Sequence, residues 1–184
     1  DAGANIGVYS QFLSSCVGPR GIVHCFEPDA LNCARLQSAL GDSTNVRINE
    51  MAVSDKTGTS TLYISDKLNV DHRAYPVSNE VRRSVSIQTT TLDDYFRTNE
   101  RLDFIKLDIQ GYEHHALRGA ERLLRENREI KLLLEFWPYG LRQADTPWEE
   151  LITLLRDQGF DLGEMSSTGL RPFRTDAIRE APDW

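Results

Sequence analysis

The sequence predicts an α/β domain in which a mostly parallel β-sheet carries helices on both faces. Short apolar runs, typical of buried strands, alternate along the chain with segments whose apolar residues recur at helical spacing. A β-hairpin insertion is expected after the third strand, where two runs of β-branched residues flank a long polar loop. The chain has 184 residues, enough for one core, so we expect a single domain over residues 1–184.

In the first part of the chain, turn residues separate the expected elements. These elements are a helix over 6–16, a strand over 21–26, a helix over 30–40 and a strand over 46–53. Asp29 is expected to cap the second helix and Gly41 to end it. Because a Gly-rich loop like the one at Asp1 normally follows a buried strand, we also expect a strand ahead of Asp1, in the middle of the sheet.

The later part of the chain is expected to complete the sheet. Its elements are hairpin strands over 59–65 and 85–91, a helical turn over 92–96, a strand over 102–109, one amphipathic helix over 116–124, a strand over 130–137, a helix ending at Gly159 and a last strand over 160–165. Thr146, Pro147 and Glu149 have the types and spacing of a capping box for that last helix. Residues 166–184 are polar and proline-containing, which predicts an irregular tail.

Composition narrows the class of function. The net charge of −7 argues against nucleic-acid binding, which depends on Lys and Arg at phosphates. No apolar run approaches the roughly 18 residues of a membrane span. Cys16, Cys25 and Cys33 do not have the spacing of a zinc site, and the first residues have no secretory signal. We therefore expect a cytoplasmic protein with reduced, mostly buried thiols.

The first seven residues, DAGANIG, place small residues where a strand would turn into a helix. Gly3 lets a ligand approach the backbone, and Gly7 lets the helix pack close to the sheet. The spacing is not the G-x-G-x-x-G of a dinucleotide loop, and the Asp1 carboxylate suits a cationic group better than a pyrophosphate. Glu27 ends the next strand. A carboxylate at this position can accept hydrogen bonds from both hydroxyls of a ribose. The alternatives are that Gly3 and Gly7 form only a simple tight turn and that Glu27 is an exposed charge at the end of a strand.

Motifs in five places, taken in order, resemble the FkbM family of S-adenosylmethionine-dependent methyltransferases. They are DAGANIG at 1–7, FEP at 26–28, AVSDKTG at 52–58, TLDDY at 91–95 and IKLDIQGYE at 105–113. The resemblance covers roughly residues 1–165, and the chain departs from it at Gln110, where the family often has Glu. It implies a class I methyltransferase fold, a Rossmann-like sandwich built on a seven-stranded sheet.

The resemblance also implies how the cofactor S-adenosylmethionine would be held. The glycine loop would hold its methionine part, Glu27 its ribose, and the segment 51–53 would pass its adenine. The implied cofactor-binding residues are Asp1, Gly3, Asn5, Gly7, Glu27, Pro28, Ala52 and Asp108.

Candidate catalytic residues cluster after the strand over 102–109. Asp108 is expected beside the transferred methyl group, by strand-end position and by the resemblance, and Glu113 or His114 could act as base. The alternatives are that Asp108 caps a helix, that Glu113 complements a helix dipole, and that His114 lies on a helix wall. Glu135 could line the acceptor pocket or pair with Lys106. No metal site is expected, because no second strand end supplies a matching acidic pair.

These observations favour an enzyme that methylates a hydroxyl of a sugar, glycan or secondary metabolite, so the expected partner is a small-molecule or carbohydrate acceptor. The oxygen acceptor rests on family analogy alone. A dinucleotide-dependent oxidoreductase is disfavoured by the glycine spacing, whereas a catalytically silent binding or scaffold module stays open. The loop over 57–83 could hold the acceptor through His72, Arg73, Tyr75 and the Arg82-Arg83 pair, or could be a solvated loop.

Overall fold

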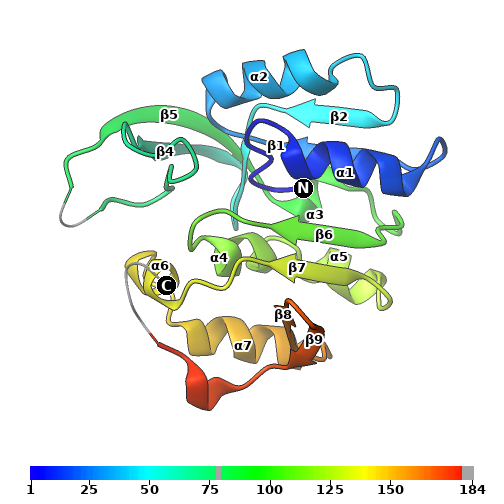
Figure 1. Ribbon diagram of the computed structural model, residues 1–184, viewed down its shortest axis with the longest axis vertical. Coiled ribbons are helices and arrows are strands. Elements are labelled where there is room, and N and C mark those ends of the chain that lie inside the picture. The colour runs from blue at the N-terminus through cyan, green and yellow to red at the C-terminus, as the bar shows by residue number, and fades with distance from the viewer. Residues whose placement is uncertain (78–79, 180–184) are drawn as a thin grey trace.

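The computed structural model describes residues 1–77 and 80–179 and is a mixed α/β structure (Figure 1). Strands β1 (Val23–Phe26) and β2 (Val46–Asn49) form one parallel pair, and β6 (Phe104–Leu107) and β7 (Lys131–Leu134) form another. Ala2 lies between these pairs, bridged in parallel to Phe26 and to Leu107. The order across the sheet is therefore β2, β1, Ala2, β6 and β7, and Ala2 occupies the middle of the sheet.

Backbone hydrogen bonds on both sides of Ala2 join the two strand pairs. The Ala2 amide donates to the carbonyl of Lys106 at 2.9 Å, and the Asp108 amide donates to the carbonyl of Ala2 at 3.2 Å. On the other side, the Phe26 amide donates to the Asp1 carbonyl at 2.9 Å. Residues 1–3 thus take the position of a central strand, hydrogen-bonded to β1 on one side and to β6 on the other.

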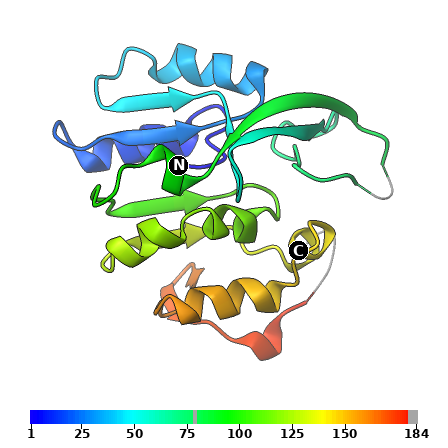
Figure 2. The same cartoon turned by 180° about the vertical axis from the view of Figure 1, so that it is seen from behind.

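Helices cover both faces of this sheet (Figures 1 and 2). On one face, α1 (Val8–Val17) and α2 (Ala30–Leu40) pack on β1 and β2 around an apolar cluster that includes Cys25, Leu36 and Leu40. On the other face, α3 (Leu92–Tyr95), α4 (Glu113–Arg118), α5 (Glu121–Glu126) and α7 (Trp148–Asp157) pack against β1 and β6 around a larger cluster. The predicted cap of α2 is confirmed, since the Asp29 carboxylate accepts from the Asn32 amide at 2.9 Å.

The predicted hairpin after the third strand is confirmed. Strand β4 (Gly58–Ile64) pairs antiparallel with β5 (Arg83–Thr90), and β3 (Ala52–Val53) pairs parallel with the end of β5. In Figure 1 the hairpin extends away from the parallel strands. The expected strand over 46–53 was wrong in one respect, because it divides at residues 50–51 into β2 and β3, which belong to different ladders.

The single amphipathic helix expected over 116–124 is two helices, α4 and α5. The helix is interrupted at Gly119. A Cβ atom there would overlap the carbonyl oxygen of Ser54, so the backbone packs directly against the segment that follows β3. The Asp93 carboxylate then accepts from the amides of Arg122 and Leu123, both at 2.9 Å. These bonds satisfy free amides in the first turn of α5. Long-range contacts therefore divide a segment whose apolar periodicity is continuous.

The capping box predicted at Thr146 does not form. Pro147 stands at the cap position of α7, and the Thr146 hydroxyl lies 3.3 Å from Nε2 of His115 instead. The preceding residues form a short helix, α6 (Pro138–Gln143), with Pro138 as its first residue. The strand expected over 130–137 ends earlier, at Leu134.

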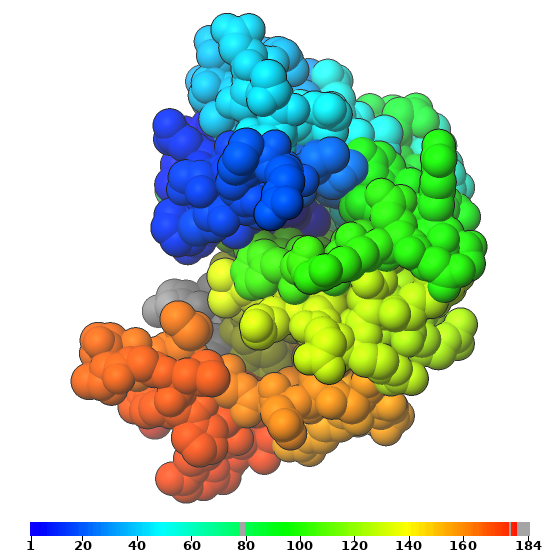
Figure 3. Space-filling view, turned by 90° about the vertical axis from the view of Figure 1, so that its right-hand side faces the viewer, coloured from blue at the N-terminus to red at the C-terminus, as the bar shows by residue number. Residues whose placement is uncertain are grey.

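The C-terminal segment also departs from expectation. The strand predicted over 160–165 becomes β8 (Gly163–Ser166), which pairs antiparallel with β9 (Gly169–Pro172) in a hairpin separate from the parallel strands. A 3-10 helix (Thr175–Ala177) follows. Residues 166–179 are thus not irregular throughout, and residues 180–184 of the predicted tail lie outside the described residues. This segment, orange to red in Figure 3, forms the end of the molecule opposite α2.

Two further sequence expectations concern thiols and membranes. Cys16, Cys25 and Cys33 are free, and Cys16 is exposed whereas the other two are buried. No helix in the described part of the chain has the length and apolarity needed to cross a bilayer.

The close packing after β6 predicts the effect of a glycine substitution. Gly111 has a φ of +92°, and an added Cβ would lie 2.6 Å from the carbonyl oxygen of Gly140. We expect Gly111→Ala to lower the free energy of unfolding by about 3 kcal/mol or more, through backbone strain plus overlap. The matched control is Gly159→Ala, since Gly159 has a similar positive φ (+88°) but nothing lies within 4 Å. It should lose only about 1–2 kcal/mol. Equal losses in urea denaturation would contradict the packing argument.

Candidate functional site

A pocket lies where β1, β3 and β6 end, the edge at which ligands bind in parallel α/β sheets. The pocket opens to solvent, and the space inside it together with its mouth is about 720 Å³. Most of the residues predicted for the cofactor line it, namely Gly3, Asn5, Glu27, Pro28, Ala52 and Asp108. Asp1 and Gly7 are not among the lining residues.

Glu27 is a buried carboxylate with a fixed orientation. It directly follows β1, and its Oε2 accepts from the Asn5 amide at 2.8 Å while its Oε1 accepts from the Asp29 amide at 2.9 Å. Only 5% of the residue is exposed, and burial raises the pKa of its carboxyl to about 7. Glu27 is therefore not a solvated strand-end charge, because it is buried and two backbone amides hold its carboxylate in place.

The fold itself requires glycine at position 3, independently of any ligand. Its φ is +74°, and a Cβ atom there would overlap the carbonyl oxygen of Asp108. The same close approach brings the glycine loop and the end of β6 together at one side of the pocket. Asn5 follows with a φ of +50°, and its side-chain oxygen accepts from the Ile6 amide at 2.8 Å, which fixes the end of the loop.

Gly7 and Asp1 do not line the pocket and have structural roles, so their contact with the cofactor stays a prediction. An added Cβ at Gly7 would lie 2.7 Å from Leu36, so Gly7 allows α1 to pack on α2, where close packing on the sheet was expected. The Asp1 side chain is fully buried, accepts from the Ser10 hydroxyl at 2.6 Å and lies 3.2 Å from Nζ of Lys106. The cation beside Asp1 is thus a lysine of the same chain and not a ligand.

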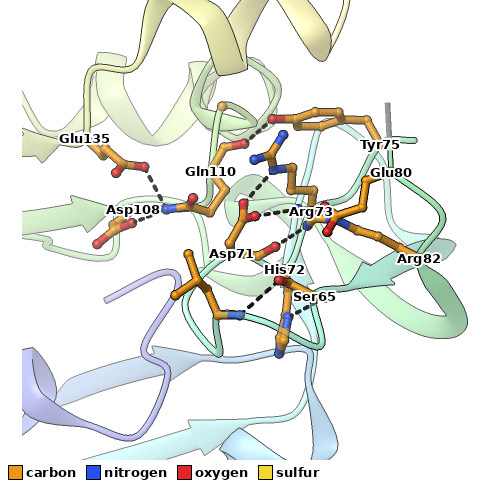
Figure 4. Close-up of polar contacts among 12 residues, drawn as sticks. Ser65, Asp71, His72, Arg73, Tyr75, Glu80, Arg82, Asp108, Gln110 and Glu135 are labelled. Atoms are coloured by element: carbon orange, nitrogen blue, oxygen red, sulfur yellow. Dashed lines mark hydrogen bonds and ion pairs between the residues drawn. The ribbon is translucent and has the colours of Figure 1, made fainter. Parts of the chain in front are cut away.

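Asp108 and Glu135 are linked through the side chain of Gln110 (Figure 4). The Gln110 Nε2 donates to Oδ1 of Asp108 at 3.2 Å and to Oε2 of Glu135 at 3.0 Å. The Asp108 side chain is 39% exposed and lines the pocket, with Lys106 3.6 Å away. Burial, together with the Asp108 charge, raises the pKa of Glu135 to about 7. Sequence reasoning missed Gln110 as a bridging residue, although a Gln-Gly pair after a strand is a signal for an unusual backbone.

Glu113 and His114, predicted as candidate bases, do not line the pocket. Glu113 is fully buried, and its Oε1 accepts from the amides of Ile109 at 3.0 Å and Gly111 at 3.3 Å. Burial raises the pKa of Glu113 to about 8. His114 lines a separate groove beside α7, together with Glu149 and Glu150, and burial lowers its pKa. Both residues begin α4, and the first turn of this helix faces the core, so neither side chain reaches the pocket.

The loop between β4 and β5 forms one wall of the pocket through Asn69, Val70, His72 and Ala74. The Asn69 carbonyl accepts from the Asn5 side chain at 3.1 Å, and its own amide group donates to the Asn32 side chain at 2.8 Å. At the other end, the Tyr75 hydroxyl donates to the Gln110 carbonyl at 2.6 Å. The loop is thus tied to the glycine loop, to α2 and to the segment after β6. Asn32 and Asn69 were missed by sequence reasoning, because only the fold brings them together.

The arginines expected to recognise an acceptor are occupied by the loop's own acids (Figure 4). Arg73 lies 2.6 Å from Asp71, and its guanidinium is 4.7 Å from the centre of the Trp137 ring. Arg82 is nearly buried and pairs with both Asp71 and Glu80. These ion pairs organise the loop, so the positions of Arg73 and Arg82 give no support to the expectation that they hold the acceptor.

Groups of three or more His, Cys, Asp or Glu side chains arranged to hold a metal ion are absent from the described residues. The polar lining of the pocket includes the carboxylates of Glu27 and Asp108, side-chain amides and the open backbone of the glycine loop.

Comparison with known proteins identifies the class to which this pocket belongs. Residues 1–162 match the methyltransferase FkbM domain. The chain belongs to the FkbM methyltransferase family, as its motifs predicted.

Named relatives share this class. The chain is 27% identical over 173 residues to the 2-O-methyltransferase NoeI of Sinorhizobium fredii, covering 84% of this chain and 69% of that protein. It is 26% identical over 199 residues to the methyltransferase sdnD of Sordaria araneosa, covering 88% and 73%. A crystal structure of the methyltransferase FkbM from Methylobacillus flagellatus superposes with a TM-score of 0.57 at 24% identity. This match covers 85% of the present chain and 36% of the solved one, and it shows the fold alone.

The buried Glu113 predicts a dependence of stability on pH. Its carboxyl has a pKa of about 8 in the folded chain against 4.5 for the free group, so the folded state holds a proton that the unfolded state has released between these values. Stability therefore falls as pH rises from about 4.5 to about 8. Glu113→Gln keeps the carbonyl that accepts from Ile109 and Gly111 and is always neutral. We expect it to match the wild type at pH 5 and to be more stable at pH 8.5, by on the order of a few kcal/mol.

Urea denaturation across this pH range measures the effect. Glu129→Gln, at an exposed position before β7, is the control and should leave the pH slope unchanged. Glu27 and Glu135, with their raised pKa values, keep part of the slope in every variant. Parallel curves for wild type and Glu113→Gln would contradict a protonated, buried Glu113.

Proposed function

We propose that this chain is an S-adenosylmethionine-dependent methyltransferase with a class I, Rossmann-like sandwich fold, acting on a hydroxyl oxygen of a sugar, glycan or secondary metabolite. The observation that carries the proposal is the Glu27 carboxylate, held by two backbone amides in a pocket that the Gly3 loop also lines. A buried carboxylate at this strand end suits a ligand with vicinal hydroxyls, as in a ribose.

The pocket residues fit a nucleoside with an attached amino acid. Each Glu27 oxygen uses one lone pair on an amide and keeps capacity to accept from a ribose hydroxyl. Ala52 and Pro28 supply small apolar surface beside Glu27, where a base ring could pack, and Gly3 leaves the loop backbone open at the other end. When bound, S-adenosylmethionine supplies a methyl group on a positively charged sulfur, already activated for displacement.

The chain's own residues then have to position an acceptor and receive its proton. Holding an acceptor oxygen in line at about 3 Å supplies a large part of the rate through positioning alone. A side chain that takes the proton of an alcohol typically adds a further 10²–10⁴-fold. Among the predicted catalytic residues, Asp108 is the one that lines the pocket, and we assign it this place at the acceptor.

Two observations support an oxygen acceptor on a neutral molecule. The first is the relative NoeI, whose name specifies 2-O-methyl transfer. The second is the pocket wall, where Asn5, Asn32 and Asn69 supply side-chain amides, a group type that both donates and accepts, as neutral hydroxyl groups require. Arg73 is already paired with Asp71 and does not call for an acidic substrate.

Calorimetric titration with S-adenosylhomocysteine tests the cofactor class. Wild type should bind it with micromolar affinity and should not bind NADH. Glu27→Ala should weaken binding by roughly 1.5–3 kcal/mol, because it removes charged hydrogen-bond acceptors, which corresponds to about 10- to 100-fold in Kd. The same change also frees the amides of Asn5 and Asp29, so the variant should lose stability as well.

Asp93→Ala separates the two effects. Asp93 is also a carboxylate that accepts from two backbone amides, but it is not part of the pocket lining. It should lose comparable stability and keep wild-type affinity for S-adenosylhomocysteine, with both variants titrated well below their melting temperatures. If Glu27→Ala bound as well as Asp93→Ala, Glu27 would have no place at the ligand; if wild type failed to bind at all, the proposed function would fall.

A further inference from the structure

The link between Asp108, Gln110 and Glu135 is not accounted for by cofactor binding. Asp108 follows β6 and Glu135 follows β7, and these strands are parallel neighbours, so the two carboxylates emerge side by side at one edge of the sheet. The Glu135 amide donates to the Leu107 carbonyl at 2.8 Å, which fixes this register at the end of β7. One amide group, Nε2 of Gln110, donates to both acids. This inference rests on the proposed function and concerns the same pocket.

Gln110 is held firmly enough to act as a bridge. Its φ is +56°, an uncommon conformation for a residue with a side chain. Two contacts stabilise that conformation: Glu113 accepts from the amides of Ile109 and Gly111 on either side, and the Tyr75 hydroxyl donates to the Gln110 carbonyl. The protein thus maintains a strained backbone whose visible result is the placement of one side chain between two carboxylates.

The charges around the pair decide what it can do. Nζ of Lys106 lies 3.6 Å from Oδ2 of Asp108, and burial raises the pKa of the neighbouring acid Glu113 to about 8. Two neighbouring carboxyls resist double ionisation, so one proton is taken up by the pair as a unit. Consistent with this, the pKa of Glu135 is raised to about 7. That value suits a general base at neutral pH.

We propose that Asp108 and Glu135, bridged by Gln110, act together as the proton acceptor for the substrate hydroxyl. Asp108 borders the pocket and faces the acceptor, whereas Glu135 is a positioning residue that acts through Asp108. As the acceptor oxygen bonds to the methyl carbon, the carbon–sulfur bond breaks and its electron pair stays on sulfur, which leaves a neutral thioether. The hydroxyl proton passes to the carboxyl pair, and solvent removes it afterwards.

The proposal is first tested without turnover, by carbon-13 NMR of side-chain carboxyls in the whole chain between pH 4 and 9. In wild type, Asp108 and Glu135 should report a shared protonation step near pH 7. In Glu135→Gln this step should disappear. Gln110→Met removes the bridge without removing either acid and should shift the step, while Glu129→Gln should leave it unchanged.

Bound ligands then show whether the pair lies at the reacting group. The sulfonium of S-adenosylmethionine carries a positive charge that S-adenosylhomocysteine lacks, and a nearby cation lowers the pKa of a carboxyl. The shared step should therefore lie lower in the complex with S-adenosylmethionine than in the complex with S-adenosylhomocysteine, by about one pH unit for charges separated by several ångströms. Calorimetry should show that Glu135→Gln binds S-adenosylhomocysteine within about twofold of wild type.

A rate measurement completes the test, with labelled S-adenosylmethionine and a panel of neutral monosaccharides. Glu135→Gln should lower kcat by about 10²-fold or more with little change in KM, and should remove the rise of kcat around pH 7. Separate titration of the two acids at ordinary values, or identical steps with the two ligands, would overturn the inference while leaving the proposed function standing. Failure of wild type to bind S-adenosylhomocysteine would overturn both.

Discussion

The whole structure depends on the backbone hydrogen bonds of residues 1–3 at the centre of the sheet: Ala2 bonds to Lys106 and Asp108, and Asp1 and Gly3 bond to Phe26. Without them the β1–β2 pair and the β6–β7 pair would share no ladder, since each pair is bonded only within itself. The ion pair of Asp1 and Lys106 lies beside this junction and is fully desolvated, so loss of either partner alone would leave a buried charge. Residues 1–3 therefore both join the sheet and fix the position of the loop that follows them.

The junction explains why the pocket lies where it does. Three strand ends meet there, and each contributes one element: the Gly3 loop after Ala2, Glu27 after β1 and Asp108 after β6. Because the loop backbone is bonded to both neighbours, Glu27 and Asp108 are held at fixed positions on opposite sides of it. The loop between β4 and β5 adds a wall of neutral amides through Asn69, and its own acids pair with its arginines. The site thus has one side fixed by the hydrogen bonds of the sheet and another formed by the loop between β4 and β5.

Much of this could be predicted from sequence, and the failures have physical causes. The bounds of α2 and the hairpin follow from local signals, such as the Asp29 cap and β-branched runs, and Glu27 follows from its place at a strand end. Glu113 was predicted as a candidate base and Asp1 as a cofactor-binding residue, whereas in the structure Glu113 accepts from backbone amides and Asp1 pairs with Lys106. The break between α4 and α5 and the Gln110 bridge depend on residues distant in the chain, which periodicity cannot reveal.

The central claim is that the pocket between Glu27 and Asp108 binds S-adenosylmethionine in one orientation. A crystal structure of the chain grown with saturating S-adenosylhomocysteine tests this most directly. We expect the ribose hydroxyls of the ligand within hydrogen-bond distance of the Glu27 carboxylate. Its amino-acid part should lie along the Gly3 loop, and its sulfur should be directed toward Asp108. A ligand bound elsewhere, or one whose ribose lies away from Glu27, would contradict it.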